Sequence, residues 1–451
     1  MASLQVPWNK YEQEIIGHLQ ALIRINTSNP PGNERAAAEY MAEVLRRDGI
    51  PAQVLESAPG RGNLVARLDG QEDREALMLL SHLDVVPAEA DKWVHPPFSG
   101  ALADGYVWGR GTLDTKNLTA MELVTVLLLK RLQVPLRRSV VLVASADEET
   151  GGHAGIVWLL ENHPEWVSAP FVINEGAGYD IQIGGRRFYT CQTGEKGFCR
   201  LTLTASGRSG HAAFRHRDTA ITRLSRALAR IGEADLPMHP SASARRFVDV
   251  VTSVLVATRP RDAALVRDLL VPQKDLAAFE QLGIQPHLAD ELYAMFRNTA
   301  NVTIVNAGKT INVVPSEASA RIDARLVPGA TDQSFLTELR AAIGDGCLVQ
   351  VDHYSPALES DPESELYDAI CNAVAAHDPE ASVVPYLVVG GTDARHIKRV
   401  FNSVIYGFKP MRQEPEAPRL ALVHGHNERI SVANLLFGTR VIFDVVSRFC
   451  A

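Results

Sequence analysis

The sequence contains few cysteines, and none of them form a metal-binding or redox motif. The five cysteines are odd in number and scattered over 451 residues, with no CxxC pair among them. They are Cys191, Cys199, Cys347, Cys371 and Cys450. This usage disfavours a disulfide framework and a cysteine-ligated metal, and it favours a reduced, cytoplasmic protein.

Long apolar runs and long basic runs are missing as well. No stretch approaches the ~18 apolar residues of a membrane-spanning helix. Residues 1–20 lack a basic region followed by an apolar core, so no signal peptide is expected. The formal net charge is −8, and there is no long basic run. Nucleic acid and membrane surfaces are therefore not expected as partners.

The chain is too long for one ordinary core, so two domains are expected. Up to residue 193, helix-like and strand-like segments alternate. Strands are predicted over 63–68, 75–86, 138–147 and 169–174, and helices over 11–25, 34–50 and 117–134. This alternation predicts an α/β catalytic domain with a mostly parallel sheet, covered by helices on both faces.

Residues 194–358 have a different character and predict an inserted α+β domain. Strands are expected over 197–206, 301–308, 317–328 and 347–355, and helices over 218–234 and 332–343. The stretch from about 235 to 300 is expected to be polar and irregular. The first domain, residues 1–193, is expected to resume over 359–451.

Polar residues interrupt the predicted strands at particular places. In "LLSHLDVVP" (79–87), His82 and Asp84 lie inside an apolar run. Successive side chains on a strand alternate faces, so these two share one face, about 6–7 Å apart. Taken alone, they could be a hydrogen-bonded polar pair.

Four further segments place acidic or histidine residues at strand ends or helix starts. The segments are "WGRGTLDTK" with Asp114, "ASADEETGG" with Asp147, Glu148 and Glu149, "VINEGAG" with Glu175, and "VHGHNERI" with His424, His426 and Glu428. Asp114 could instead be a helix N-cap. The carboxyl ends of parallel strands meet at one edge, where ligands bind. We therefore expect these side chains to converge.

Converging carboxylates are costly unless cations compensate them. Two zinc ions would balance Asp114, Glu149 and Glu175 together with a bridging hydroxide. His82 and His424 would add one neutral nitrogen ligand per metal, giving a mixed N/O set that zinc accepts.

Such a site produces a metal-bound hydroxide and polarises a carbonyl. Glu148 would be free to act as general base. Asp84 would hold the ring of His82.

The motifs "SHLDVVP", "GRGTLDTK", "ADEETGG", "NEG" and "HGHNE" occur in this order and closely resemble the M20 metallopeptidase family. That family includes aminoacylases, succinyl-diaminopimelate desuccinylases, carboxypeptidases and dipeptidases. The resemblance extends over nearly the whole chain, and the five motifs together are highly specific.

The resemblance implies a role for each motif residue. His82 and Glu175 would bind one zinc, Glu149 and His424 the other, and Asp114 would bridge them. Glu148 would be the base, and Asp84 would orient a ligand. The first histidine of the last motif is the usual ligand, which favours His424, although His426 lies close. The bond after Asp114 would be cis.

The resemblance also assigns residues to the substrate. The inserted domain matches the family's lid, in which His211 would stabilise the oxyanion, and Asn312 and Arg325 would lie over the substrate. In "GGTDAR" (390–395), Gly391 and Thr392 would hold a substrate carboxylate. Arg395 would be a second carboxylate ligand or a structural ion-pair residue.

The resemblance implies a homodimer through the lid, in which His211 reaches the partner's active site. The stretch at 235–300 is longer than in compact members and could cover the lid edge. In a monomer, His211 would have to reach its own site through lid closure. The long lid resembles the carboxypeptidase S-like and N-acyl-amino-acid-hydrolase branch.

We therefore expect a dinuclear, metal-dependent amidohydrolase. Its small-molecule substrates would be N-acyl-amino acids, or related amides, with a free carboxylate. The nearest alternative is a dipeptidase or carboxypeptidase of the same family. A binding protein without the chemistry is disfavoured, because Glu148 and Asp114 are both present. Zinc is the expected metal, with cobalt or manganese as alternatives.

Overall fold

The computed structural model describes residues 6–72 and 74–451. The first five residues of the segment 1–20, for which no signal peptide is expected, lie outside the described residues. The chain forms two compact units. The first comprises Met1–Thr193, Ser360–Val384 and Thr392–Ala451, and the second Gly194–Glu359 and Pro385–Gly391. The segment Pro385–Gly391 thus clusters with the second unit, although the sequence-based boundaries placed it in the first.

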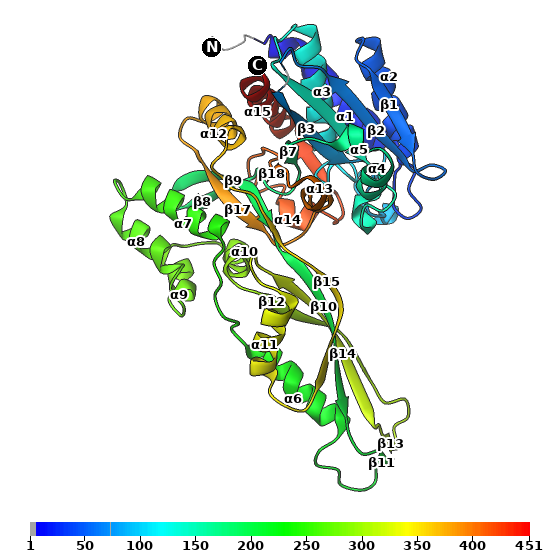
Figure 1. The fold of residues 1–451 in the computed structure, drawn as a ribbon, viewed down its shortest axis with the longest axis vertical. Helices are drawn as coiled ribbons and strands as arrows, with labels where there is room; N and C mark the ends of the chain where they lie inside the picture. The colour runs from blue at the N-terminus through cyan, green and yellow to red at the C-terminus, as the bar shows by residue number, and fades with distance from the viewer. Residues whose placement is uncertain (1–5, 73) are drawn as a thin grey trace. The chain divides into compact units, whose positions relative to one another are not determined.

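The first unit is built on a sheet whose central strands run in the order β1-β2-β6-β3-β7-β18-β9 (Figure 1). The four in the middle, β6, β3, β7 and β18, are parallel, and the flanking pairs are antiparallel. The strands are β1 (Ala52–Glu56), β2 (Gly62–Leu68), β3 (Arg74–His82), β6 (Arg138–Ser145), β7 (Phe171–Asn174), β8 (Asp180–Ile183), β9 (Arg186–Glu195), β17 (Ser382–Val388) and β18 (Val404–Gly407). A small sheet contains β4 (Ala101–Ala103), β5 (Tyr106–Trp108) and β19 (Arg429–Ser431). The mainly parallel α/β core confirms the predicted fold class.

Helices pack on both faces of this sheet (Figure 1). The helices of this unit are α1 (Glu12–Arg24), α2 (Glu34–Arg47), α3 (Lys116–Arg131), α4 (Ile156–Asn162), α5 (Pro164–Val167), α12 (Glu365–His377), α13 (Ala394–Phe401), α14 (Arg419–Leu422) and α15 (Val432–Cys450), with short 3-10 helices η1 (Trp8–Lys10), η2 (Ala90–Lys92) and η3 (Glu148–Thr150). Helix α3 is buried from Lys116 to Leu129, in agreement with its long apolar sequence. Among the described residues, no helix has the length and apolar character needed to cross a membrane.

The second unit contains a four-stranded antiparallel sheet in the order β12-β14-β10-β15. Helices α6 (Ala220–Glu233) and α11 (Asp332–Ile343) cover one face, where Leu201, Leu203 and Phe335 belong to a single apolar core. The strands of this sheet are β10 (Gly197–Ser206), β12 (Thr299–Ala307), β14 (Glu317–Leu326) and β15 (Leu348–Ser355). The short strands β11 (Gly210–His211) and β13 (Val313–Val314) pair with each other, and β16 (Leu358–Glu359) pairs with β9. Strand β10 alternates buried and less buried residues, as expected for a sheet with one covered face.

The expectation of an irregular stretch at 235–300 is wrong. Four helices occupy most of it: α7 (Ala242–Leu255), α8 (Pro260–Asp268), α9 (Asp275–Gln281) and α10 (Pro286–Phe296). In α7, Phe247, Val251 and Leu255 recur at intervals of four residues and are fully buried. The many polar residues therefore form the exposed faces of short amphipathic helices.

Candidate metal centre and active site

His82 is the last residue of β3 and is 2% exposed. Its Nδ1 lies 3.0 Å from the backbone oxygen of Asp84 and 3.4 Å from Asp84 Oδ1. Its Nε2 lies 3.3 Å from Asp114 Oδ1 and 3.3 Å from Glu175 Oε1. Asp84 therefore fixes the ring so that the second nitrogen points to two carboxylates from other segments.

Asp114 lies in the turn between β5 and α3, and its peptide bond to Thr115 is cis, as the resemblance implied. The buried carboxylate of Glu428 accepts hydrogen bonds from the backbone N–H groups of Gly111, Leu113 and Asp114. These bonds fix the turn, and Arg110 balances the charge of Glu428 with an ion pair of 2.7 Å.

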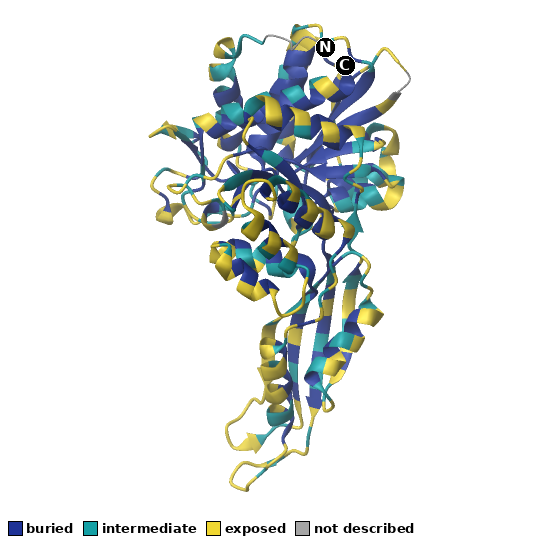
Figure 2. Ribbon diagram, turned by 90° about the vertical axis from the view of Figure 1, so that its left-hand side faces the viewer, coloured by how far each residue is buried: buried dark blue, intermediate teal, exposed yellow. Residues whose placement is uncertain are grey.

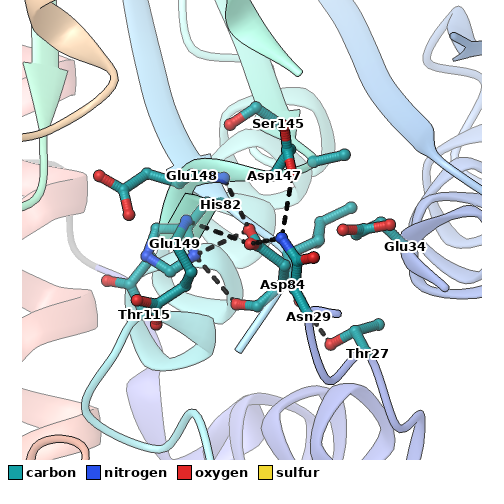
Figure 3. A network of polar contacts seen from close by, with 12 residues as sticks. Thr27, Asn29, Glu34, His82, Asp84, Thr115, Ser145, Asp147, Glu148 and Glu149 are labelled. Carbon is teal, nitrogen blue, oxygen red and sulfur yellow. Dashed lines mark hydrogen bonds and ion pairs between the residues drawn. The ribbon is translucent and has the colours of Figure 1, made fainter. Parts of the chain in front are cut away.

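Glu148 and Glu149 begin η3, directly after the carboxyl end of β6. Their backbone N–H groups donate to Asp84, at 3.0 Å to Oδ1 and 3.1 Å to Oδ2 (Figure 3). Asp84 is fully buried. Burial would raise its pKa, but hydrogen bonds from His82, Asn29 and the Glu149 backbone hold the pKa below its ordinary value. One carboxylate thus positions both the imidazole of His82 and the turn that carries the two glutamates.

Glu175 follows β7, and His424 lies in the loop between α14 and β19. His424 Nε2 lies 3.0 Å from Asp114 Oδ2 and 3.3 Å from Glu149 Oε2. His426 instead contacts the exposed Glu89 at 2.9 Å, away from these carboxylates. The geometry favours His424 over His426 as the ligand.

The five residues form two groups that share Asp114. One is His82, Asp114 and Glu175, and the other is Asp114, Glu149 and His424. In each group the potential ligand atoms lie within 4.8 Å of one another. A carboxylate common to both groups is the arrangement expected of a bridging ligand between two cations.

Electrostatics indicate that positive charge belongs here. Hydrogen bonds to Asp114 and Glu149 raise the pKa of His424 to about 10. Burial opposes the protonation of His82, but the neighbouring carboxylates of Glu175, Asp114 and Asp84 hold its pKa well above the ordinary value. The carboxylates attract protons strongly onto both rings, and a divalent cation would supply the same compensation.

The donor chemistry also fits metal ions. Two imidazoles and three carboxylates form an N/O set that zinc accepts. In addition, Glu149 Oε1 is buried without a hydrogen-bond partner among the residues that the structure describes. The residues present therefore fit two divalent cations.

Glu148 lies beside this cluster but belongs to neither group. Burial raises its pKa well above the ordinary value of a glutamate, and the charges of Glu175, Asp393 and Glu149 raise it further. A carboxylate with a raised pKa is suited to accept a proton near neutral pH.

The residues expected to hold the substrate are divided between the two units. In the first, Thr392 accepts a hydrogen bond of 2.7 Å from Asn174, and Arg395 donates to the Thr392 backbone oxygen at 2.8 Å. In the second, Arg325 on β14 stacks over Phe198, with the guanidinium carbon 4.1 Å from the ring centre.

His211 and Asn312 adjoin one another in the second unit, where β11 pairs with β13 and the Ala212 N–H donates to the Asn312 backbone oxygen at 3.0 Å. Both residues are exposed. The remaining residue of this set, Gly391, is partly exposed. The roles of all six in substrate binding stay predictions.

Sequence reasoning missed one cation beside the site. Lys409 follows β18 and donates to the Leu113 backbone oxygen and to Thr115 Oγ1, and its Nζ lies 3.7 Å from Glu175 Oε2. The only sequence signal was its position just after an apolar strand that ends at the same sheet edge. Asn29 and Asp147, which contact Asp84 and the glutamate turn, were also not assigned a role.

Known proteins share this sequence pattern. The model of Peptidase family M20/M25/M40 matches residues 78–448. The N-fatty-acyl-amino acid synthase/hydrolase PM20D1 of Xenopus tropicalis is 30% identical over 448 residues, which cover 94% of this chain and 83% of that protein. Human aminoacylase-1 is 26% identical over 432 residues, which cover 93% of this chain and 91% of that protein.

The fold agrees with the sequence comparison. The M20 family metallo-carboxypeptidase Sso-CP2 from Sulfolobus solfataricus has a similar fold, with a TM-score of 0.67 and 18% identity over 97% of this chain and 99% of that one. The family model covers most of the chain, and the predicted motifs lie within the matched residues. The chain therefore belongs to Peptidase family M20/M25/M40 and is a metal-dependent hydrolytic enzyme.

Proposed function

We propose that this enzyme hydrolyses the amide bond of N-acyl-amino acids with a free carboxylate, using two divalent metal ions, zinc in the first instance. The observation that carries the proposal is the pair of ligand groups joined by Asp114, with Glu148 beside them. The names of the relatives in the N-fatty-acyl-amino acid hydrolase and aminoacylase groups support the substrate class.

The chemistry divides between the cations and the chain. When bound, the two cations would lower the pKa of a water molecule and polarise the scissile carbonyl. A carboxylate oxygen of Glu148 accepts the water proton during attack on that carbonyl and later delivers it to the leaving amine. Asp84 keeps the Glu148 turn and the His82 ring in place through the hydrogen bonds described above.

The substrate carboxylate would be held by Arg325, by the loop of Gly391 and Thr392, by Arg395, and by Asn312 of the partner subunit. A planar guanidinium forms two parallel hydrogen bonds with a carboxylate, which suits Arg325 to this role. Its side chain is 28% exposed, so a ligand can approach it. Its Nε forms an ion pair with Asp323 at 2.6 Å. Holding the carboxylate would decide which bond lies over the reactive centre.

A dipeptidase or carboxypeptidase is the second candidate. The similarity in fold to a metallo-carboxypeptidase favours it, because peptides and N-acyl-amino acids share the amide bond and the carboxylate. The two functions differ only in the group on the acyl side, which is a peptide in one case and a simple acyl chain in the other.

A matched substrate panel tests both functions. The metal-loaded protein is offered N-acetyl and long-chain N-acyl amino acids, free dipeptides, and the same compounds with the carboxylate amidated. Glu148→Gln is the inactive variant, and Glu161→Gln, on the exposed side of α4, is the matched control. We expect release of amino acid from the acylated set, its loss on amidation, and activity only in the wild type and the control.

Other outcomes of the panel are equally informative. Cleavage confined to dipeptides would establish the second candidate. Equal turnover by wild type and Glu148→Gln, or no turnover of any compound, would contradict the proposed chemistry.

We also propose that the enzyme acts as a homodimer through the second unit. His211 and Asn312 lie beside β13, whereas Arg325 lies near the other end of β14. Figure 1 shows β11 and β13 together at one end of β14. From Glu317 to Arg325 an extended strand covers about 26 Å. One small substrate cannot touch both ends of this sheet, so His211 and Arg325 of one chain would serve different active sites.

The edge of the sheet offers a surface for the second copy. Strand β12 is an edge strand, and Ile304 and Val305 on it are 52% and 55% exposed. The helices of 235–300 therefore leave this strand exposed within the second unit. An exposed apolar edge strand tends to pair with another chain.

Sedimentation velocity tests the dimer directly. Ile304→Lys should shift the protein toward a monomer. Leu348→Lys, at an exposed residue on the opposite edge strand β15, should leave the dimer intact. A wild type that sediments as a monomer at all concentrations would exclude it.

A further inference from the structure

Asp147 is the first acid of the "DEE" run, yet it belongs to neither ligand group. Its backbone φ is +70°, in the left-handed region. Its Oδ1 accepts hydrogen bonds from Asn29 at 3.0 Å, from Arg61 at 2.9 Å and from Thr150 Oγ1, and its Oδ2 accepts one from the Ala154 N–H at 2.9 Å. The carboxylate thus closes the turn that carries Glu148 and Glu149.

Asn29 connects this carboxylate to Asp84. Its Nδ2 donates to Asp84 Oδ2 at 2.9 Å and to Asp147 Oδ1 at 3.0 Å (Figure 3). The same Nδ2 lies 3.1 Å from Thr150 Oγ1. Asn29 is 4% exposed, and its backbone N–H donates to Val85 O at 2.8 Å. The segment before α2 is therefore paired to the chain just beyond β3, and the amide lies between two carboxylates.

Arg61 offsets the negative charges of Asp147 and of the neighbouring Glu34. Arg61 donates to both oxygens of the buried Glu34, at 2.9 and 2.8 Å, and to Asp147 Oδ1. Its side chain is 15% exposed. A partly buried guanidinium with two carboxylate partners holds a fixed position better than a surface ion pair.

We propose that Asn29, Asp147 and Arg61 form a brace that positions Glu148 for proton transfer. On one side of the turn, Asp84 accepts the N–H groups of Glu148 and Glu149. On the other, Asp147 accepts the N–H of Ala154. Asn29 joins the two carboxylates, so the turn is held from both ends. The brace contacts no reacting atom, and its residues are positioning residues. This inference rests on the function proposed above.

An asparagine is specifically required at this place. Its amide supplies two hydrogens to two carboxylates without adding charge. Asn29→Asp has nearly the same size, but it removes both donors and adds a third carboxylate to a buried pair, which is strongly unfavourable. Asn29→Ser, which keeps a short polar group, serves where the aspartate variant does not fold.

Amide hydrogen exchange of the metal-free protein tests the brace without relying on activity. We expect exchange in residues 146–155 to be at least about tenfold faster in Asn29→Ser than in the wild type. Residues 138–144 of β6 should be unchanged. Asn434→Ala is the matched control, because Asn434 is another buried asparagine of the first unit, bonded at 2.7 and 2.9 Å to the Arg412 backbone. Unchanged exchange over 146–155 in Asn29→Ser would overturn the brace.

Kinetics of the metal-loaded protein test what the brace does. We expect Asn29→Ser and Asp147→Ala to lower kcat by about 10- to 100-fold with KM nearly unchanged, since small misplacements of a catalytic group are costly. Metal content should remain that of the wild type. The double variant should lose little more than the larger single loss, because both substitutions break one unit.

Three results separate the possible failures. A lower melting temperature with wild-type kcat would show a purely structural role and overturn the inference. Loss of metal would show that these residues act through the ligand Glu149, which the same turn carries, rather than through Glu148, and would overturn the inference too. If faster exchange appears but no compound of the panel is hydrolysed by the wild type, the proposed function fails while the brace itself stands.

Discussion

The metal-site edge of the first unit and the β11–β13 end of the second unit differ in how their predicted residues are held. At the metal-site edge, His82 is 2% exposed and contacts three other residues of the site. At the β11–β13 end, His211 and Asn312 are exposed, and Ile311 beside them is fully exposed. Figure 2 shows this end of the second unit, at the bottom of the view, mostly in the yellow of exposed residues.

The difference indicates which of the predicted site residues are already held in place within one unit. Buried ligands with converging partners are already arranged for cations within the first unit. Among the described residues, the side chain of His211 in the second unit has local contacts: a hydrogen bond from the Ala213 N–H to its Nδ1 at 3.1 Å and a ring contact with Phe214. A side chain that needs a defined position for catalysis and lacks one within its own unit must obtain it from another surface.

Removing one histidine from each region gives the largest expected effects. His82→Ala should abolish both metal binding at its group and hydrolysis, a greater loss than the roughly 10- to 100-fold typical of outer-shell partners. His211→Ala should retain all metal and lose about 10²- to 10³-fold in kcat, as expected for one oxyanion donor. Metal analysis and kcat measure the two separately. Full activity with two retained metals in His82→Ala would refute the site.

The neighbouring histidines of the last motif give a smaller but sharper comparison. His424→Ala should lose metal from the group with Asp114 and Glu149 and lose most activity. His426→Ala removes only a contact between exposed side chains, with Glu89, and should leave metal content and kcat/KM unchanged. If instead His426→Ala loses the metal, the ligand assignment of this motif must be reversed.

Much of the metal-site edge could be predicted from the sequence for a definite physical reason. His82 is the last residue of one parallel strand, Glu149 and Glu175 follow the ends of two others, and the carboxyl ends of such strands meet at one edge. The spacing of polar residues along each strand was therefore enough to expect convergence. Asn29 could not be found in this way, because tertiary pairing places it there without any local pattern. Lys409 follows an apolar strand, but a single lysine after a strand does not by itself predict a contact with Thr115.

The helices of 235–300 were missed although signals for two of them were present. Pro260 and Pro286 stand at the first positions of α8 and α10, where proline is favoured. The sequence of this stretch predicted only a polar, irregular segment. Short helices bury only a narrow apolar stripe, so their sequences look polar overall.

Mixing two inactive variants tests whether the two regions work across copies. In a dimer of His211→Ala and Glu148→Gln, one active site would combine an intact Glu148 with the partner's intact His211. Random exchange of subunits makes half of the dimers mixed, and one of their two sites is active, so about a quarter of wild-type activity should return. Activity that stays at the level of the separate variants would place both residues in the same chain's site.

The smallest expected effect concerns stability in the second unit. Lys196 is 1% exposed, and its Nζ donates to the backbone oxygens of Ala294 at 2.9 Å and Arg297 at 2.7 Å. Burial, aided by the charge of Arg325, lowers its pKa from 10.5 to about 7. Between these values the unfolded chain binds more protons than the folded one. The contribution of Lys196 to the free energy of unfolding should therefore rise with pH above about 7, by at most about 1.4 kcal/mol per pH unit.

Lys196→Met should remove this part of the pH dependence. Urea unfolding is followed by far-UV circular dichroism between pH 7 and 9. The free energy of unfolding should rise less steeply with pH in the variant, by a difference in slope that corresponds to at most one proton. All five tryptophans precede residue 194, so tryptophan fluorescence follows the unfolding of the first unit and should show equal slopes for both proteins where the two units unfold separately. Equal slopes by circular dichroism as well would mean that Lys196 keeps the same protonation in the folded and unfolded chain. The hydrogen bonds to α10 would then fully offset the cost of burying the charged amine. The stability of the second unit would not depend on pH through this residue.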